Sequence, residues 1–112
     1  MAFKLAQTET FKADVTVLIA NDKGGFDKNT FKAIFKRPST KELVALFESS
    51  PGDDDLIRKY LHGWEMTDSE TNEAVPFNPE NVAALLEITT APAAVARAFV
   101  ETVRGARTKN SK

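Results

Sequence analysis

The stretch LIRKYLHGWEMTDSETNEAVPF, residues 56–77, decides the fold of this chain. Its first half is amphipathic, with apolar residues at the spacing of one helical face. These residues are Leu56, Ile57, Tyr60, Leu61 and Trp64. Because glycine favours the C-terminal cap of a helix, we expect the helix to end at Gly63. A polar, acidic excursion follows over 67–74, and we expect two short strands, 64–66 and 75–77, to enclose it.

Upstream of this stretch, apolar and polar residues alternate as they do in a half-buried strand. The alternation runs from Phe11 to Ile19 and resumes from Phe31 to Phe35. Between the two runs lies Asn21–Gly25, NDKGG, whose residue types favour a turn. The N-terminal part therefore predicts a β-hairpin with a long tip.

Capping signals predict the starts of the helices. Ser39 and Glu42 form a capping box, and the acidic residues 53–55 suit the positive end of a helix dipole. Asn78-Pro79 is an N-cap followed by a first-turn proline, and Pro92 starts a last helix. These signals predict about four short helices.

Length and composition predict one domain. The chain has 112 residues, of which 42% are hydrophobic and 28% charged, both ordinary for a globular protein. We expect an α+β fold, an N-terminal β-hairpin packed on about four short α-helices, with a second short hairpin around 64–77. The domain should span 11–104, between a flexible N-terminus at 1–10 and a flexible basic tail at 105–112. The predicted core consists of Val15, Val17, Ile19, Leu46, Phe47, Leu61, Trp64, Phe77, Leu85 and Leu86.

Charge is distributed unevenly along the chain. Residues 1–47 hold eight Lys or Arg and five Asp or Glu, residues 48–87 hold two and ten, and residues 88–112 hold five and one. This distribution fits either three solvated surfaces or attraction between oppositely charged parts of different copies. The longest apolar run, Val17–Ala20, is far shorter than a membrane span, so we expect no contact with a membrane.

No residue pattern in the sequence predicts catalysis or a cofactor. Cysteine is absent, which excludes disulfides and thiolate ligands. His62 is the only histidine, and Asp53, Asp54 and Asp55 point about 100° apart on a helix, so they do not converge on a metal ion. An enzyme needs a recognisable acid, base or nucleophile. We therefore expect a protein that is not an enzyme and binds no metal or cofactor.

Five short motifs follow one another along the chain: FKAIFKR at 31–37, LHGW at 61–64, DSE at 68–70, VPF at 75–77 and NPE at 78–80. In this order they resemble the tail assembly chaperones of long-tailed bacteriophages, over about residues 11–104. In that family a glycine is common in the acidic turn, where this chain has Thr71-Asn72.

The resemblance implies a chaperone that binds the long, hydrophobic, helical tape measure protein before the tail tube closes around it. It implies work in the host cytoplasm, absence from the mature virion, displacement by tail tube subunits, and self-association. It also implies a longer product made by ribosomal frameshifting. Thr108-Lys109-Asn110 can be encoded by the slippery sequence A-AAA-AAC, but other codons encode these residues equally well, so the residues also fit a chance match. The expected partner-binding residues are Phe31, Phe35, Arg37, Val95, Phe99 and Val103.

Two other functions remain open from the sequence. Basic residues along one predicted strand and on the last helix fit a small nucleic-acid-binding or regulatory adaptor. They are Lys28, Lys32, Lys36, Arg37, Arg97, Arg104 and Arg107. A structural tail completion or connector protein is the other alternative. The weak net charge of −1 makes binding to nucleic acid the less expected outcome.

Overall fold

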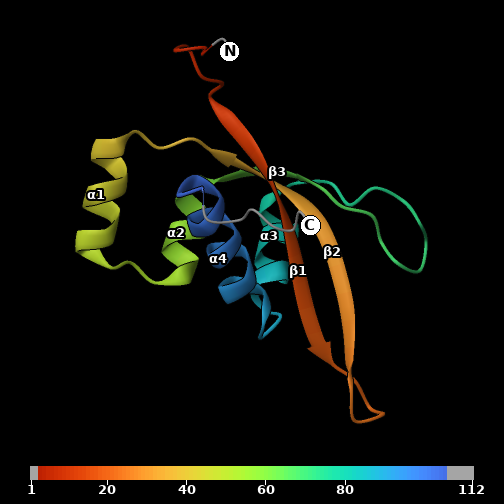
Figure 1. Cartoon of the computed structure of the whole chain (residues 1–112). Coiled ribbons are helices and arrows are strands. Elements are labelled where there is room, and N and C mark those ends of the chain that lie inside the picture. Colours follow the sequence, from red (N-terminus) through yellow and green to blue (C-terminus); the bar gives the residue numbers. More distant parts are fainter. Residues whose placement is uncertain (1–2, 106–112) are drawn as a thin grey trace.

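Three antiparallel strands and four helices form the domain in the computed structural model, which describes residues 3–105 (Figure 1). The strands pair in the order β1-β2-β3. The elements are β1 (Thr10–Ala20), β2 (Phe26–Lys36), α1 (Thr40–Ser49), α2 (Asp53–Tyr60), β3 (Leu61–Glu65), α3 (Pro79–Leu86) and α4 (Ala91–Val103). This is the predicted α+β fold with its N-terminal hairpin. The predicted tail at 105–112 lies outside the described residues, except for Gly105.

The hairpin has the register that the alternation predicts. Strands β1 and β2 pair over their full length, from Thr10 opposite Lys36 to Ala20 opposite Phe26. Odd-numbered residues face the helices, and the side chains of Val15, Val17 and Phe31 are buried there. Even-numbered residues form the open face of the sheet, which no helix covers in the described part of the chain. Figure 1 shows the distal end of the hairpin extending past the helices.

Strand β3 corrects the prediction that the helix of the 56–77 stretch continues to Gly63. The helix ends at Tyr60, and Leu61–Glu65 pairs with β2. The register shifts between Ile34 and Phe35, because Phe35 lies opposite Leu61 while Ile34 lies opposite Gly63. His62 is therefore the extra residue of a β-bulge. The bulge turns both Leu61 and Trp64 toward the helices, and both are buried.

The predicted second hairpin is only partly formed. A single bridge joins Thr67 to Ala74, and residues 75–77 are not a strand. The return segment is held instead by Trp64, whose indole Nε1–H donates to the Val75 carbonyl at 2.8 Å. Asp68 folds the turn by accepting from the amides of Glu70 and Thr71. These backbone hydrogen bonds lower the pKa of the Asp68 carboxyl, that of Thr71 most.

The four helices start where the capping signals predict. Ser39 accepts from the Glu42 amide and Glu42 accepts from the Ser39 amide, which completes the capping box of α1. The Asn78 side chain caps α3 by accepting from the Asn81 amide. A proline lies in the first turn of both α3 and α4.

The core centres on a cluster of aromatic rings between the sheet and the helices. Phe99 stacks on Tyr60 with 4.8 Å between ring centroids, and it also contacts Phe11 and Phe35. A second contact joins Phe31 to Trp64. Tyr60 is almost fully buried, and burial raises the pKa of its hydroxyl.

Most of the predicted core residues are buried, with two corrections. Phe47 and Phe77 are 43% and 40% exposed, because each lies at the border of the helical layer and lines a surface cavity. Ile19 and Leu86 are half-buried and pack against the core. The six that are buried are Val15, Val17, Leu46, Leu61, Trp64 and Leu85.

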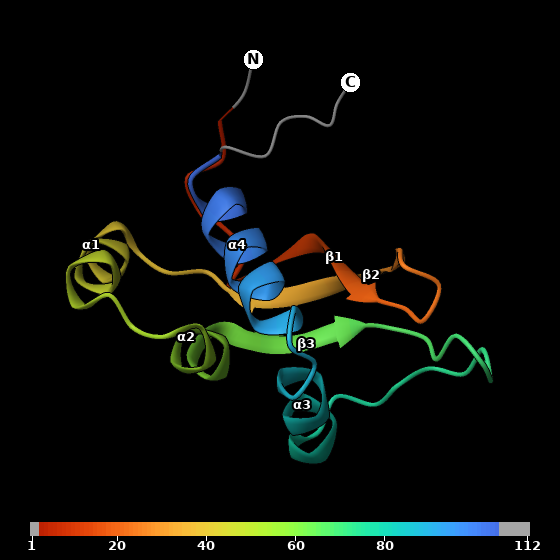
Figure 2. The same cartoon turned by 90° about the horizontal axis from the view of Figure 1, so that it is seen from below.

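Helix α1 stands apart from the other helices. Helices α2, α3 and α4 pack against one another or the sheet, whereas α1 lies at one end of the molecule (Figure 2). Only Leu46 is buried on α1. This position leaves a cleft between α1 and the body of the domain.

Candidate partner-binding surfaces

The structure places four of the six expected partner-binding residues in the core. Phe35, Val95 and Phe99 are completely buried, and Phe31 is 7% exposed. In the folded domain these four side chains are therefore not exposed for a partner to contact. The i, i+4 spacing of Val95 and Phe99 marks the buried stripe of α4, not an exposed one.

The other two expected residues lie nearer the surface. Val103 is half-buried near the end of α4. Arg37 is half-buried and holds the segment before β1. Its guanidinium Nε–H donates to the Thr8 carbonyl at 2.8 Å, and its charge lies 5.4 Å from the centre of the Phe11 ring. Arg37 therefore has a structural role at this end of the hairpin.

The α1 cleft is the first surface that a partner can use. Its volume is about 340 Å³, and most of its lining is apolar. The lining residues are Leu46, Phe47, Ser50, Pro51, Asp53, Leu56, Ala96, Arg97 and Val100. They come from α1, from the segment between α1 and α2, from the start of α2 and from one side of α4. A cleft formed between helices can accept the apolar side chains of a third helix.

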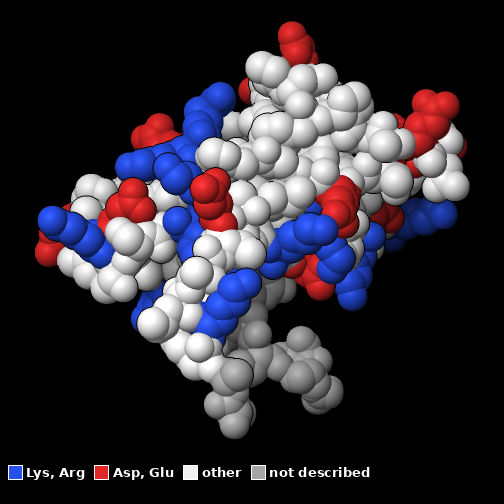
Figure 3. Space-filling model, turned by 90° about the horizontal axis from the view of Figure 1, so that it is seen from above, with Lys and Arg blue, Asp and Glu red and all other residues white. Residues whose placement is uncertain are grey.

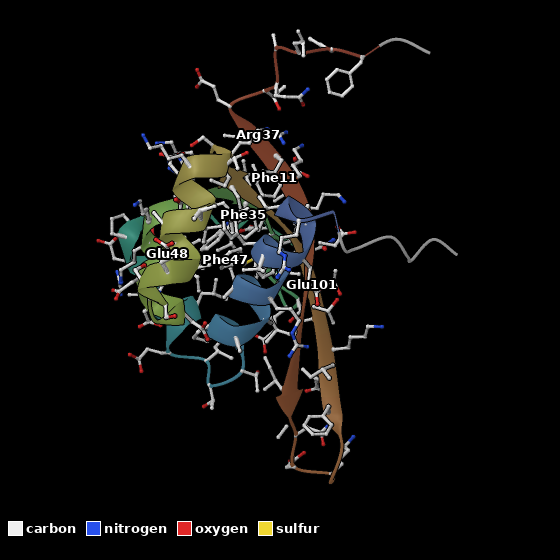
Figure 4. The ribbon with its side chains drawn as sticks, turned by 60° about the vertical axis from the view of Figure 1, so that its left-hand side comes forward. Phe11, Phe35, Arg37, Phe47, Glu48 and Glu101 are labelled. Atoms are coloured by element: carbon white, nitrogen blue, oxygen red, sulfur yellow. The ribbon has the colours of Figure 1, made fainter. Side chains whose placement is uncertain are left out.

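Phe47 is the main exposed ring of the α1 cleft. It lies on the side of α1 that faces α4 (Figure 4). The Arg104 guanidinium lies over the ring at 5.4 Å, a cation–π contact at the edge of the cleft. Val44, on the same helix, is 51% exposed. Together, Phe47 and Val44 expose apolar surface on a helix that has little packing elsewhere.

The Phe77 groove is a second apolar surface, with a volume of about 350 Å³. It lies between α2 and the start of α3, and is lined by Ile57, Arg58, Leu61, Phe77, Asn78, Pro79 and Val82. Phe77 contacts the Trp64 ring edge-on, with 4.9 Å between centroids. The VPF motif thus places one aromatic ring at the surface and rests it on a buried one.

The open face of the sheet does not form a continuous basic surface. Lys12 pairs with Glu65 at 2.6 Å and Lys32 pairs with Asp14 at 2.7 Å. The bond to Asp14 raises the pKa of Lys32, and the bond to Lys12 lowers the pKa of Glu65. Figure 3 shows acidic and basic side chains next to one another, with a broad uncharged area beside them. This arrangement disfavours the nucleic-acid adaptor.

Among residues 3–105, no group of three or more His, Asp or Glu residues is placed to hold a metal ion. No single helix in this part of the chain is long and apolar enough to cross a membrane. Helices α3 and α4 together are long and apolar enough, but the chain bends by 102° at the break between them.

Sequence reasoning missed both surfaces because their key residues resemble core residues. Phe47 follows Leu43 and Leu46 at helical spacing, and Phe77 ends an apolar triplet. One signal was available for α1: Pro51 and Gly52 separate it from α2, so the two helices are not one continuous packing unit.

A protein-family model described as phage tail assembly chaperone matches residues 1–110 of the chain. No curated protein and no solved structure matches the chain.

Proposed function

Because the chain belongs to the phage tail assembly chaperone family, we propose that it binds and solubilises the tape measure protein during tail morphogenesis. The observation that carries the proposal is the α1 cleft, with Phe47 and Val44 exposed on a loosely packed helix. Exposed apolar surface of this kind marks interaction sites in soluble proteins.

The α1 cleft suits an amphipathic helix as its ligand. Its apolar floor, from Leu46, Leu56 and Val100, can receive side chains spaced three and four residues apart. A long helical client carries many such stripes, so many copies of the chaperone can cover it. Each contact can be weak, because the client binds many copies at once. Weak individual contacts also allow tail tube subunits to displace the chaperone.

The proposal includes where the protein works and what it assembles with. It acts in the host cytoplasm and is absent from the mature virion, because a displaced chaperone leaves before the tail is complete. Its partners are the tape measure protein, tail tube subunits during displacement, and further copies of itself. Neither the nucleic-acid adaptor nor the connector protein is supported by a feature of the described surface.

Co-expression with the tape measure protein tests the proposal. The wild-type chain should keep the client soluble, and Phe47→Asp should leave most of it in the pellet, because a carboxylate is costly to bury in an apolar contact. Lys41→Asp is the matched control, since Lys41 is exposed on the same helix outside the cleft. Equal soluble yields with Phe47→Asp and Lys41→Asp contradict the assignment to the cleft. An insoluble client beside the wild-type chain contradicts the function.

A longer product is also part of the proposal. We expect a −1 frameshift near Thr108–Asn110 to append a second domain in a minority of molecules, through the sequence A-AAA-AAC. The gene sequence tests this directly. The proposal in this form is excluded if the gene lacks the slippery sequence, or if the overlapping −1 reading frame reaches a stop codon immediately.

A further inference from the structure

The outer edge of β2 is free over its distal half. Strand β3 ends opposite Lys32, so the residues from Phe26 to Phe31 have β1 on one side only. At the two ends of the hairpin, the Asn21 amide donates to the Gly25 carbonyl and the Arg37 amide donates to the Glu9 carbonyl. Both bonds join odd-numbered residues, and hydrogen-bonded pairs alternate along an antiparallel ladder, so the odd-numbered residues of β2 bond to β1. The backbone N–H and C=O groups of the even-numbered residues Phe26, Lys28 and Thr30 therefore point outward, away from β1.

A groove lies beside this free edge. Its volume is about 480 Å³, the largest of the cavities described here. Val17, Ile19 and Phe31 line it from the hairpin, and Leu85 and Ile88 from the end of α3. Residues 66–69 form the far wall. Unpaired backbone groups next to an apolar groove are the features that accept an added strand.

The other edge of the sheet is less accessible. At the outer side of β1, the Leu18 carbonyl accepts a hydrogen bond from the Thr90 hydroxyl at 2.7 Å, and α4 packs along this strand. A helix satisfies its own backbone groups, so the free edge of β2 calls for an extended segment as its ligand.

The segment before β1 has the properties of such a ligand. Phe3 and Leu5 are 81% and 86% exposed, and they lie in a segment without helix or strand. Because they are two residues apart, an extended backbone places both side chains on one face. In contrast, the sequence of residues 106–112, ARTKNSK, offers no large apolar side chain.

This segment cannot reach the groove of its own copy. Arg37 holds Thr8 at the opposite end of the hairpin. The seven residues from Thr30 to Arg37 span about 24 Å of strand, at about 3.4 Å per residue. Phe3 precedes Thr8 by five residues and extends at most about 18 Å from it. Only another copy can place its Phe3 and Leu5 in the groove.

We propose that residues 3–7 of one copy add as a strand to the free edge of β2 in a second copy, with Phe3 and Leu5 in the groove. This contact deepens the self-association that is part of the proposed function. Each copy has one groove and one donor segment at different ends of the hairpin. The contact is therefore heterologous, and assemblies larger than a dimer can form.

Cysteine cross-linking tests the contact, because the chain has no cysteine of its own. The backbone groups of Asn29 bond to β1, so Asn29 and the residue opposite it in an added strand form a non-hydrogen-bonded pair. The Cα atoms of such a pair are about 4.5 Å apart, which is close enough for a disulfide between two cysteines. Two mixtures are oxidised: Phe3→Cys with a tagged Asn29→Cys copy, and Leu5→Cys with the same copy. One of the two mixtures should give a mixed dimer at least about tenfold faster than the control mixture of Lys41→Cys with Asn29→Cys, since Lys41 is exposed outside the cleft. Control-level rates in both mixtures overturn the proposal.

The mass of the isolated chain gives a second test. Light scattering should show a mass that rises with concentration above 12.3 kDa. The double variant Phe3→Asp/Leu5→Asp should remain a monomer at concentrations about tenfold higher, while Lys41→Asp, exposed on α1 outside the cleft, behaves as the wild type. Both side chains are exposed, so an unchanged melting temperature should confirm folding. A wild type that is monomeric throughout, or a double variant that associates equally, refutes this contact. No client is present, so this result is separate from the co-expression test.

Discussion

At Asn72 the backbone has φ +63°, the left-handed conformation that glycine adopts most easily. Asparagine is one of the few other residues that tolerate the conformation, and the Asn72 amide bonds to the Asp68 carbonyl at 2.8 Å. The turn therefore forms here without a glycine.

Substitution of Asn72 tests this explanation. Asn72→Gly should change the free energy of unfolding by less than about 0.5 kcal/mol. Asn72→Val should lower it by about 1–2 kcal/mol, because a β-branched residue is strained at positive φ. Urea unfolding of the two variants measures the difference. Equal stability of the two variants contradicts the explanation.

Trp64 joins the sheet, the return segment that follows the 67–74 excursion, and the Phe77 groove. Trp64→Ala removes the ring contacts with Phe31 and Phe77 and the hydrogen bond to Val75. We expect a loss of about 3–5 kcal/mol and a melting temperature lower by more than about 10 °C. Trp64→Phe keeps a ring and loses the hydrogen bond, so its melting temperature should fall between those of the wild type and Trp64→Ala. A near-normal melt of the alanine variant contradicts this account.

Among the elements, α1 should respond to pH. The hydrogen bond from the Ser39 amide lowers the pKa of the Glu42 carboxyl from its usual value of 4.5. A lowered pKa means that ionised Glu42 stabilises α1 above that value, and that the contribution disappears as the pH falls through the lowered pKa.

Nuclear magnetic resonance of the α1 amides between pH 7 and about pH 3 measures this response. The start of α1 should lose helical chemical shifts on acidification before the core unfolds. Glu42→Gln should remove the pH dependence, because glutamine does not ionise in this range. If the α1 amides of Glu42→Gln show the same pH dependence as those of the wild type, another titrating group causes the loss of helical structure.

Elements with local signals were predictable from the sequence. The hairpin follows from alternation and turn residues, and α1, α3 and α4 begin at capping residues or prolines. Strand β3 was not predictable, because the bulge at His62 puts Leu61 and Trp64 on one side of a strand although they are three residues apart. That spacing is typical of a helix. Only pairing with β2, which is far away in the sequence, decides between the two structures.

The candidate surfaces were less predictable than the fold. Sequence patterns mark apolar residues, but they do not tell a residue in the core from one at its border. Phe35 and Phe99 are buried because they meet Phe11 and Tyr60 across the sheet and helices. Phe47 has no such partners in the described core, since α1 projects from the domain.

At the scale of the whole molecule, acidic and basic side chains lie next to one another on the face shown in Figure 3, although they are segregated along the sequence. We therefore predict negligible affinity for generic DNA at physiological salt, with little change between about 50 and 200 mM salt, because few phosphates can be neutralised. A gel-shift titration at several salt concentrations measures this. Tight binding with a steep salt dependence would favour the nucleic-acid adaptor over the chaperone.

The position of the only tryptophan gives the protein a built-in optical probe. The Trp64 indole lies under Phe77, at the border of the Phe77 groove, and its N–H is held by the return segment. Its emission should move to longer wavelength when the excursion opens and water reaches the ring. Client helices that bind only in the α1 cleft should leave the emission maximum unchanged. The fluorescence of the unlabelled protein can therefore tell which of the two surfaces a client occupies.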